Sequence, residues 1–499
     1  MKIRMTISGL IVALAAIPTL TAWYTGQQVE AFVTQSIEDG NVELRTLGKK
    51  WGVTPVIELM SFERGVFSST VRYRVKIGVA AQHGNQPAEE GKSFELVDNL
   101  WHGPFPLSNL ASGRLAPAMV AGRVQLMPTP MVNDWFAATQ GAAPLAGAYS
   151  VSYDKQVDSS LNLASFEASN DGRKLTFAGL AADVSYDIDT RHGVLALESD
   201  GFALAGPKQG NDIDAMAVKG ITANIDLTPG KSDIALGSQM LALKEWTFIS
   251  RTNPLVTLRD TGIGLELTEA DTGVSAKMAL DVGMLSFRGT DVAGLKLAVG
   301  MKHMDPKAVK ALSDVMDARS RRTGLAFFEL EGGGSPAMEH EASEEQQILK
   351  ANLQALLAGN PILSVSPFQL RTASGTSTFD LNVALAKPTL TDSPLDLDIF
   401  RPVGKLDAKL VLSRTNLVEL LAIALQQEGD TVDSAAPTAR MIVENFSEQV
   451  VKKGLAKMEG NNIVSTLNYA GGQVDLNGNK MSRLQFVKMV LSAGKDSER

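Results

Sequence analysis

Hydrophobic and polar residues alternate with a period of two along much of the chain, which predicts β-strands. In the clearest case, the apolar residues are Val71, Tyr73, Val75, Ile77 and Val79, and the residues between them are Arg72, Arg74, Lys76 and Gly78. Successive side chains of a strand point to opposite faces, so this segment has one apolar and one basic face. We expect the apolar face to lie in the core and the basic face in solvent.

Three segments of residues 148–302 resemble one another and predict an antiparallel meander. Gly179, Gly220 and Gly262 recur 41 and 42 residues apart, and each precedes an alternating strand, a polar turn and a second apolar strand. A sheet of such hairpins has one long apolar face, which must be covered by a second sheet, by curling, by helices or by an apolar ligand. We predict a sandwich or a curled sheet, and a lipid-binding groove is a further alternative.

Helical patterns are concentrated in the C-terminal third of the chain. Pro306 follows Asp305, and this pair predicts an N-capped helix over residues 306–322. Similar patterns predict helices at 344–357, 416–426, 438–458 and 483–491, and strands at 363–370, 378–385, 463–469 and 473–476. Gly471-Gly472 and Asn477-Gly478 are typical of tight hairpin turns. The predicted fold class is therefore α+β and β-rich.

The N-terminal segment has the features of a membrane anchor. Lys2 and Arg4 precede an apolar, charge-free run over residues 5–24. As a helix, this run spans about 30 Å, the thickness of the hydrocarbon core of a bilayer. The basic residues favour the cytoplasmic side, so the rest of the chain is expected on the other side. The alternative is a cleaved signal peptide with its apolar core in residues 7–17, which also exports the body.

These patterns suggest four regions. Residues 1–26 are the anchor or signal peptide, 27–331 a β-rich exported domain, 332–346 a flexible linker or insertion, and 347–499 a mixed α/β C-terminal region that is separate or packed on the same sheet. The linker is indicated by a Gly-Gly-Gly-Ser-Pro run followed by acidic residues. Residues 27–50 are amphipathic and predict a helix, which forms a stalk or packs on the body.

Composition excludes several classes of function. The 499 residues carry a formal charge of −8, which disfavours nucleic acid as a partner. The chain has no cysteine, so disulfides, a cysteine nucleophile and thiolate metal sites are excluded. It has five scattered histidines and none of the usual hydrolase, P-loop or zinc-protease motifs. We therefore assign no catalytic residue, no cofactor site and no metal site.

One short stretch is a candidate recognition corner. It consists of Trp101, His102, Gly103, Pro104, Phe105 and Pro106. The two prolines fix an extended backbone around Phe105, and Gly103 permits close approach of another chain. The alternative is a packed corner in which a backbone carbonyl satisfies His102.

The same stretch carries a family resemblance. The apolar N-terminal helix, the segment Phe62-Glu63-Arg64-Gly65 and the His102–Pro106 string together resemble the YdgA-like bacterial envelope proteins of unknown function. The closing segments Leu467-Asn468-Tyr469 and Gly472–Gly478 are similar to the end of that family. The resemblance implies a single anchor in a Gram-negative inner membrane and a periplasmic body, and it implies no activity.

The resulting hypothesis is an anchored periplasmic protein that is not an enzyme. In this hypothesis the inner membrane holds residues 5–24, and the β-rich body binds a lipid or another envelope protein. The alternatives are an envelope hydrolase with an unrecognised site and a structural spacer. A hydrolase would require polar residues to converge in a pocket, for instance around His102.

Overall fold

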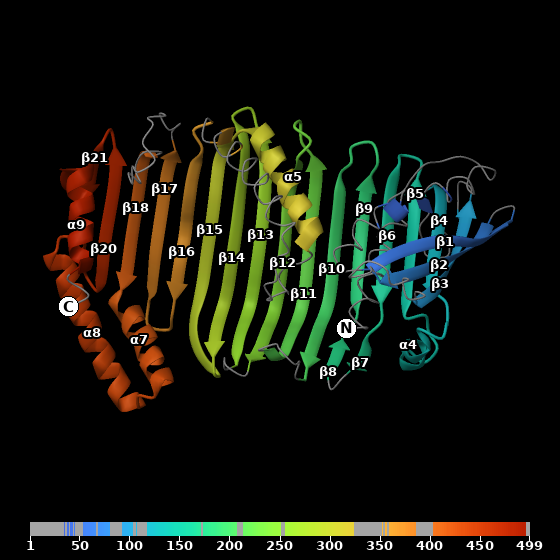
Figure 1. The fold of residues 1–499 in the computed structure, drawn as a ribbon, viewed down its shortest axis with the longest axis horizontal. Helices are drawn as coiled ribbons and strands as arrows, with labels where there is room; N and C mark the ends of the chain where they lie inside the picture. Colours follow the sequence, from blue (N-terminus) through green and yellow to red (C-terminus); the bar gives the residue numbers. More distant parts are fainter. Residues whose placement is uncertain are drawn as a thin grey trace, which may run out of the picture. The chain divides into compact units, whose positions relative to one another are not determined.

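In the computed structural model, antiparallel β-strands dominate the chain (Figure 1). The structure describes residues 34, 37–38, 40–42, 44, 53–65, 68–79, 92–102, 106, 117–170, 173–206, 213–250, 255–323, 352, 355–356, 359–385 and 403–495. The chain divides into two compact units. Unit 1 comprises Met1–Pro229 and Ser313–Ala342, and unit 2 comprises Gly230–Leu312 and Ser343–Arg499. The linker predicted at 332–346 lies outside the described residues and stays a prediction.

The strands of unit 1 form an antiparallel meander. They are β1 (Val53–Arg64), β2 (Ser68–Val79), β3 (Lys92–His102), β4 (Ala118–Leu126), β5 (Leu145–Ser152), β6 (Gln156–Leu163), β7 (Phe166–Asn170), β8 (Arg173–Phe177), β9 (Leu180–Asp187), β10 (Gly193–Ala205) and β11 (Ile213–Pro229), with helix α4 (Asn133–Ala138) after β4. β6 pairs with β9, and the β7–β8 hairpin between them pairs with the second half of β10. The predicted antiparallel meander is confirmed.

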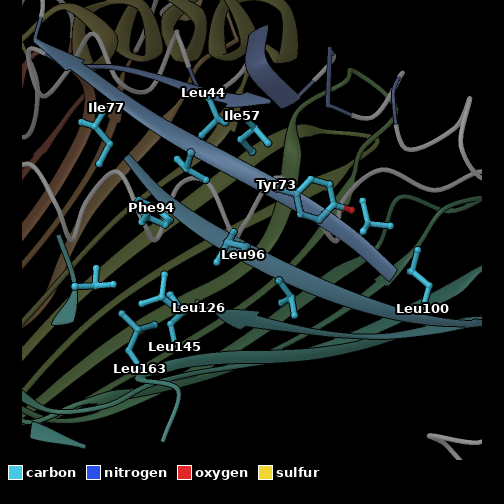
Figure 2. Close-up of a cluster of buried hydrophobic side chains, with 14 residues drawn as sticks. Leu44, Ile57, Tyr73, Ile77, Phe94, Leu96, Leu100, Leu126, Leu145 and Leu163 are labelled. Carbon is cyan, nitrogen blue, oxygen red and sulfur yellow. The ribbon is translucent and has the colours of Figure 1, made fainter. Parts of the chain in front are cut away.

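Unit 1 encloses its main core by curling. One cluster of buried side chains contains residues from every strand between β1 and β6, including the non-neighbouring Ile57, Phe94 and Leu163 (Figure 2). The apolar face predicted for the Val71 segment lies in this core, with Val71 and Val75 fully buried. Arg74 and Lys76 on the other face pair with Glu95 and Glu58 of the neighbouring strands. Curling therefore hides this part of the apolar face without a second sheet.

The segment before β1 packs on the body and does not form a free stalk. The described residues between 34 and 44 are helical, and Leu44 is fully buried in the core cluster. The side-chain amide of Asn41 donates to the carbonyl of Ile57 at 2.9 Å and accepts from its N–H at 2.8 Å. Among the described strands β1 pairs with β2 alone, so this amide occupies peptide positions that another strand would fill.

The Phe62–Gly65 motif ends β1 and makes its turn to β2. Phe62 packs against the core, and Gly65 donates its N–H to the carbonyl of Ser68 at 2.6 Å. A Cβ atom at Gly65 would lie 2.5 Å from that carbonyl oxygen, so a side chain does not fit here. The motif is thus explained by the close approach of two backbone segments.

Unit 2 is a second antiparallel meander with helices at its margins. Its strands are β12 (Ala235–Ser250), β13 (Val256–Ala270), β14 (Gly273–Phe287), β15 (Thr290–Met304), β16 (Ile362–Arg371), β17 (Thr376–Leu385), β18 (Val403–Ser413), β19 (Lys457–Glu459), β20 (Asn462–Ala470), β21 (Gln473–Leu476) and β22 (Asn479–Ser482). Its helices are α7 (Arg414–Glu428), α8 (Val432–Lys452), α9 (Arg483–Lys495) and the first part of α5 (Pro306–Thr323), up to Leu312. Helices are concentrated in the C-terminal third, as predicted.

Local signals explain where the unit 2 helices begin and end. Asp305 caps α5 by accepting the N–H of Ala308 at 2.9 Å, which confirms the predicted cap. Ser413 caps α7, and the left-handed Gly429 ends it. The side chain of Asn416 is buried and fully paired: it accepts from Ser377 and donates to Thr372 and to the carbonyl of Gly375. This network fixes the start of α7 to the β16–β17 turn.

Two sequence predictions in these regions need correction, and a third is confirmed. Gly220 and Gly262 lie inside β11 and β13 and do not precede them, because both strands begin earlier than their alternating segments suggested. The helix predicted over 438–458 is α8, Val432–Lys452, since Thr431 caps it and the left-handed Gly454 follows its end. The closing turns at Gly471-Gly472 and Asn477-Gly478 are confirmed by their positive φ angles.

The predicted membrane anchor falls outside the described part of the chain. Residues 5–24 are not described, and no helix within the described ranges is long and apolar enough to cross a membrane. The anchor therefore stays a prediction.

The Asn41 contact gives the first testable expectation. In Asn41→Ala, the buried N–H and carbonyl of Ile57 lose their partners, and the free energy of unfolding of unit 1 should fall by about 2 kcal/mol. Hydrogen exchange measured by mass spectrometry should be faster at Ile57. Val42→Ala on the same segment removes an exposed side chain and serves as the control. Unchanged exchange at Ile57 would show that Asn41 does not hold β1.

Candidate functional site

The predicted recognition corner begins at the end of β3. Trp101 and His102 are its last two residues, and Pro106 is buried. The guanidinium carbon of Arg123, on β4, lies 6.0 Å from the centroid of the Trp101 ring, which is a cation–π contact. Gly103, Pro104 and Phe105 lie outside the described residues, as does the side chain of His102. A recognition role for this corner stays a prediction.

A buried carboxylate in the core of unit 1 was missed by the sequence analysis. Asp98 lies on β3 in the same alternating row as Phe94, Leu96 and Leu100, and it is fully buried. Its Oδ2 accepts a hydrogen bond from the hydroxyl of Tyr149 at 2.8 Å, and Tyr73 supplies a second hydroxyl. The sequence did contain a signal for this site. A charged residue stands at a core position of an alternating strand.

A glycine allows Tyr149 to reach this carboxylate. Tyr149 on β5 is paired with Gly122 on β4, and Gly122 is paired with Leu100 on β3. The tyrosine side chain therefore extends across the intervening strand. A Cβ atom at Gly122 would lie 2.3 Å from the Tyr149 ring, so only glycine leaves room for it. Three strands are thus joined by one hydrogen-bonded cluster.

Burial dominates the electrostatics of this cluster. It raises the pKa of Asp98 from its ordinary 3.8 to about 6, and the hydrogen bonds from Tyr149 and Tyr73 partly offset that effect. Burial and the nearby Asp98 charge also raise the pKa of both tyrosines well above 10.0. Asp98 can therefore exchange a proton near neutral pH, whereas the two tyrosines stay protonated there.

Unit 2 contains an extended apolar surface. Fifteen paired residues on β13–β17 form three adjacent rows, and we call these residues the apolar face. The rows are Ile263, Leu280, Leu297, Phe368 and Phe379; Leu265, Met278, Val299, Val365 and Leu381; and Leu267, Ala276, Met301, Leu363 and Val383. All fifteen side chains are hydrophobic. The opposite side of the same strands has a polar row: Glu266, Lys277, Gly300, Ser364 and Asn382.

Helix α5 covers only part of the apolar face. Leu267, Ala276 and Met301 of the third row pack in a cluster with Val309 and Leu312 of α5. In the first two rows, four large side chains remain exposed: Ile263 by 42%, Leu265 by 37%, Met278 by 47% and Phe368 by 37%. At the far end of the sheet, α9 covers Tyr469 and Val474. The middle of the sheet therefore presents hydrocarbon to solvent, which in a folded protein marks a binding surface.

Other chemistry is sparse in the described ranges. They contain no group of three or more histidine, aspartate or glutamate side chains suited to a metal ion. His192 contacts Asp226 at 2.9 Å on the surface. Asp187 accepts the N–H of Thr190 at 2.7 Å, and that hydrogen bond lowers its pKa. Asp187 thus stabilises a turn and Asp226 pairs with a neighbouring side chain, so the apolar face is the main candidate site.

Asp98 leads to a prediction about pH. Its folded-state pKa is raised, so its contribution to stability is complete below about pH 4 and is lost as the pH rises through about 6. The difference between the two pKa values corresponds to about 3 kcal/mol. Asp98→Asn should therefore flatten the pH dependence of the free energy of unfolding by that amount, measured by urea denaturation between pH 4 and 7.

The exposed Asp200 provides the control for this experiment. Asp200→Asn should keep the pH dependence of the unsubstituted protein. Identical pH profiles for Asp98→Asn and the unsubstituted protein would show that Asp98 does not titrate in this range.

Comparison with known proteins places the chain in a protein family. The chain is similar to Protein YdgA of Escherichia coli strain K12, with 26% identity over 495 residues, 96% of this chain and 95% of that protein. It is also 21% identical to the uncharacterised protein YihF of the same organism, over 97% of this chain and 98% of that protein. No solved structure matches significantly. A family model described as a bacterial protein of unknown function, DUF945, matches residues 1–483, so the chain belongs to this YdgA-like family.

Proposed function

We propose that this protein binds the hydrocarbon chain of a lipid on the apolar face of unit 2. The observation that carries the proposal is the exposure of Ile263, Leu265, Met278 and Phe368 on one continuous surface. Each methylene group of a ligand that is buried on such a surface contributes about 0.8 kcal/mol. A hydrocarbon chain therefore gains affinity from contact alone.

The dimensions of the surface fit this ligand. Neighbouring strands lie about 4.8 Å apart, so the distance from β13 to β17 is roughly 19 Å. One leaflet of a bilayer has a hydrocarbon thickness of about 15 Å, which is the span of a packed acyl chain. One acyl chain can therefore lie across the five strands along either exposed row.

The chemistry of the surface favours lipid over a protein partner. Interfaces between proteins carry about one hydrogen bond per 100–200 Å² and include polar side chains. The fifteen side chains of the apolar face include no hydrogen-bonding group. A hydrocarbon ligand needs none, whereas a protein partner would bring backbone groups that require pairing.

We further propose that residues 5–24 anchor the protein in the bacterial inner membrane with the body in the periplasm. Support comes from the apolar run and from the basic residues that precede it. An anchored body with an open hydrocarbon-binding surface would be close to a source of lipid.

The lipid proposal predicts where a photoreactive lipid will attach. The full chain in mild detergent, irradiated with a phospholipid that carries a diazirine on its acyl chain, should yield crosslinked peptides from β13–β16. Leu265→Lys should reduce the yield severalfold, because a charge would be buried against hydrocarbon. Mass spectrometry of the digested protein locates the crosslinks.

Met240→Lys is the matched control for this substitution. Met240 is 58% exposed and pairs with Gly264, so it lies on the opposite face of the same strands. The crosslinking yield of the Met240→Lys variant should equal that of the unsubstituted protein. Crosslinks confined to α8 or α9, or an equal loss in both variants, would contradict lipid binding on the apolar face. Capture of a protein in its place would favour a protein partner.

The anchor proposal has a separate test. Protein extracted from bacterial membranes should have an intact mass that includes residues 1–26, and it should resist alkaline carbonate. Replacing residues 1–26 by a cleavable signal peptide should release the body into the periplasmic fraction. A mature N-terminus immediately after Ala22 would show that the segment is a signal peptide.

A further inference from the structure

A polar position adjoins the apolar face. Thr261 pairs with Val282 on β14, in the row next to Ile263 and Leu280, and it is only 5% exposed. Its hydroxyl oxygen is buried and has no hydrogen-bond partner. A buried hydroxyl without a partner costs about 1–3 kcal/mol, so this position is unfavourable unless another group satisfies it.

A second unpaired donor lies two residues away on the same strand. Arg259 follows in the next row, where it pairs with Met284, and its Nε is also buried without a partner. Its terminal nitrogen donates to Ser286 at 2.7 Å and to Asp291. The guanidinium is therefore held in place, while its buried Nε–H has no partner. The Cα atoms of residues two apart on a strand, such as Arg259 and Thr261, lie about 6.8 Å apart.

The surrounding charges limit what this group can be. Asp291 forms an ion pair with Arg259, and Glu245 is the residue paired with Arg259 on β12. The charge of the guanidinium is thus already paired with a carboxylate, so a phosphate or carboxylate ligand would gain little from it. A neutral acceptor, such as the carbonyl oxygen of an ester, would satisfy the donors without that cost.

We propose that Thr261 and Arg259 bind the ester carbonyl of an acyl lipid whose hydrocarbon chain lies on the apolar face. This inference rests on the proposed function and adds the ligand class: a lipid with an ester bond between its acyl chain and its headgroup. The hydroxyl of Thr261 and the Nε–H of Arg259 donate to the ester. The adjoining rows of the apolar face receive the chain.

The test compares two neutral probes that differ only in their linkage. Dioleoylglycerol carries ester carbonyls, and the corresponding dialkyl glycerol ether has none. Each is titrated against the full chain as a competitor of the photoreactive lipid, with loss of crosslinking on β13–β16 as the readout. The ester should compete about tenfold better than the ether, the effect of one buried hydrogen bond.

Two variants of Thr261 test the contact itself. Thr261→Val keeps the shape and removes the hydroxyl but leaves Arg259, so ester affinity should fall severalfold toward that of the ether, with ether affinity unchanged. Thr261→Ser restores a hydroxyl and should retain the preference for ester. Because Thr261→Val removes an unpaired buried group, its melting temperature in the absence of lipid should not decrease.

The outcomes separate this inference from the proposed function. If neither probe competes, the proposed function fails. If ester and ether compete equally and Thr261→Val changes neither, the hydroxyl is satisfied by water. In that case the ester inference is wrong, whereas hydrocarbon binding stands.

Discussion

The structure depends on one constraint: each strand of an antiparallel meander has an apolar face that must leave water. Unit 1 and unit 2 meet this constraint differently. In unit 1, the sheet curls until side chains from β1 and β6 share one core. In unit 2, α5 and α9 cover separate parts of the sheet, and hydrocarbon remains exposed between them. The same strand chemistry therefore gives a closed core in one unit and an open surface in the other.

Polar groups in these apolar surroundings also differ in how they are satisfied. Asn416 is buried, and Ser377, Thr372 and the backbone satisfy it, so its role is to hold a turn and a helix together. Asp98 keeps one hydrogen-bonded oxygen and one unpaired oxygen in the core, and its burial there raises its pKa. Thr261 has no partner for its hydroxyl. Of the three, Thr261 adjoins an open apolar surface, which is why we propose that it contacts a ligand.

The helical residues before β1 are part of the body of unit 1. Asn41 binds the edge of β1 as a strand would, and Leu44 inserts into the core. Among the described strands β1 pairs with β2, and Asn41 occupies its other edge at Ile57, which limits pairing with other chains there.

The sequence by itself determined the local elements: the Val71 strand, the cap at Asp305, the closing hairpin turns and the alternation of Ile263, Leu265 and Leu267. These follow from interactions within a few residues. It placed Gly220 and Gly262 wrongly at strand starts, because a glycine inside a long strand and one before it look alike. Only the tertiary structure decided the register that aligns Leu265, Met278 and Val365 in one row, carries Tyr149 across Gly122 to Asp98, and leaves Thr261 beside the exposed face. Register depends on pairing between distant segments, and no local pattern records it.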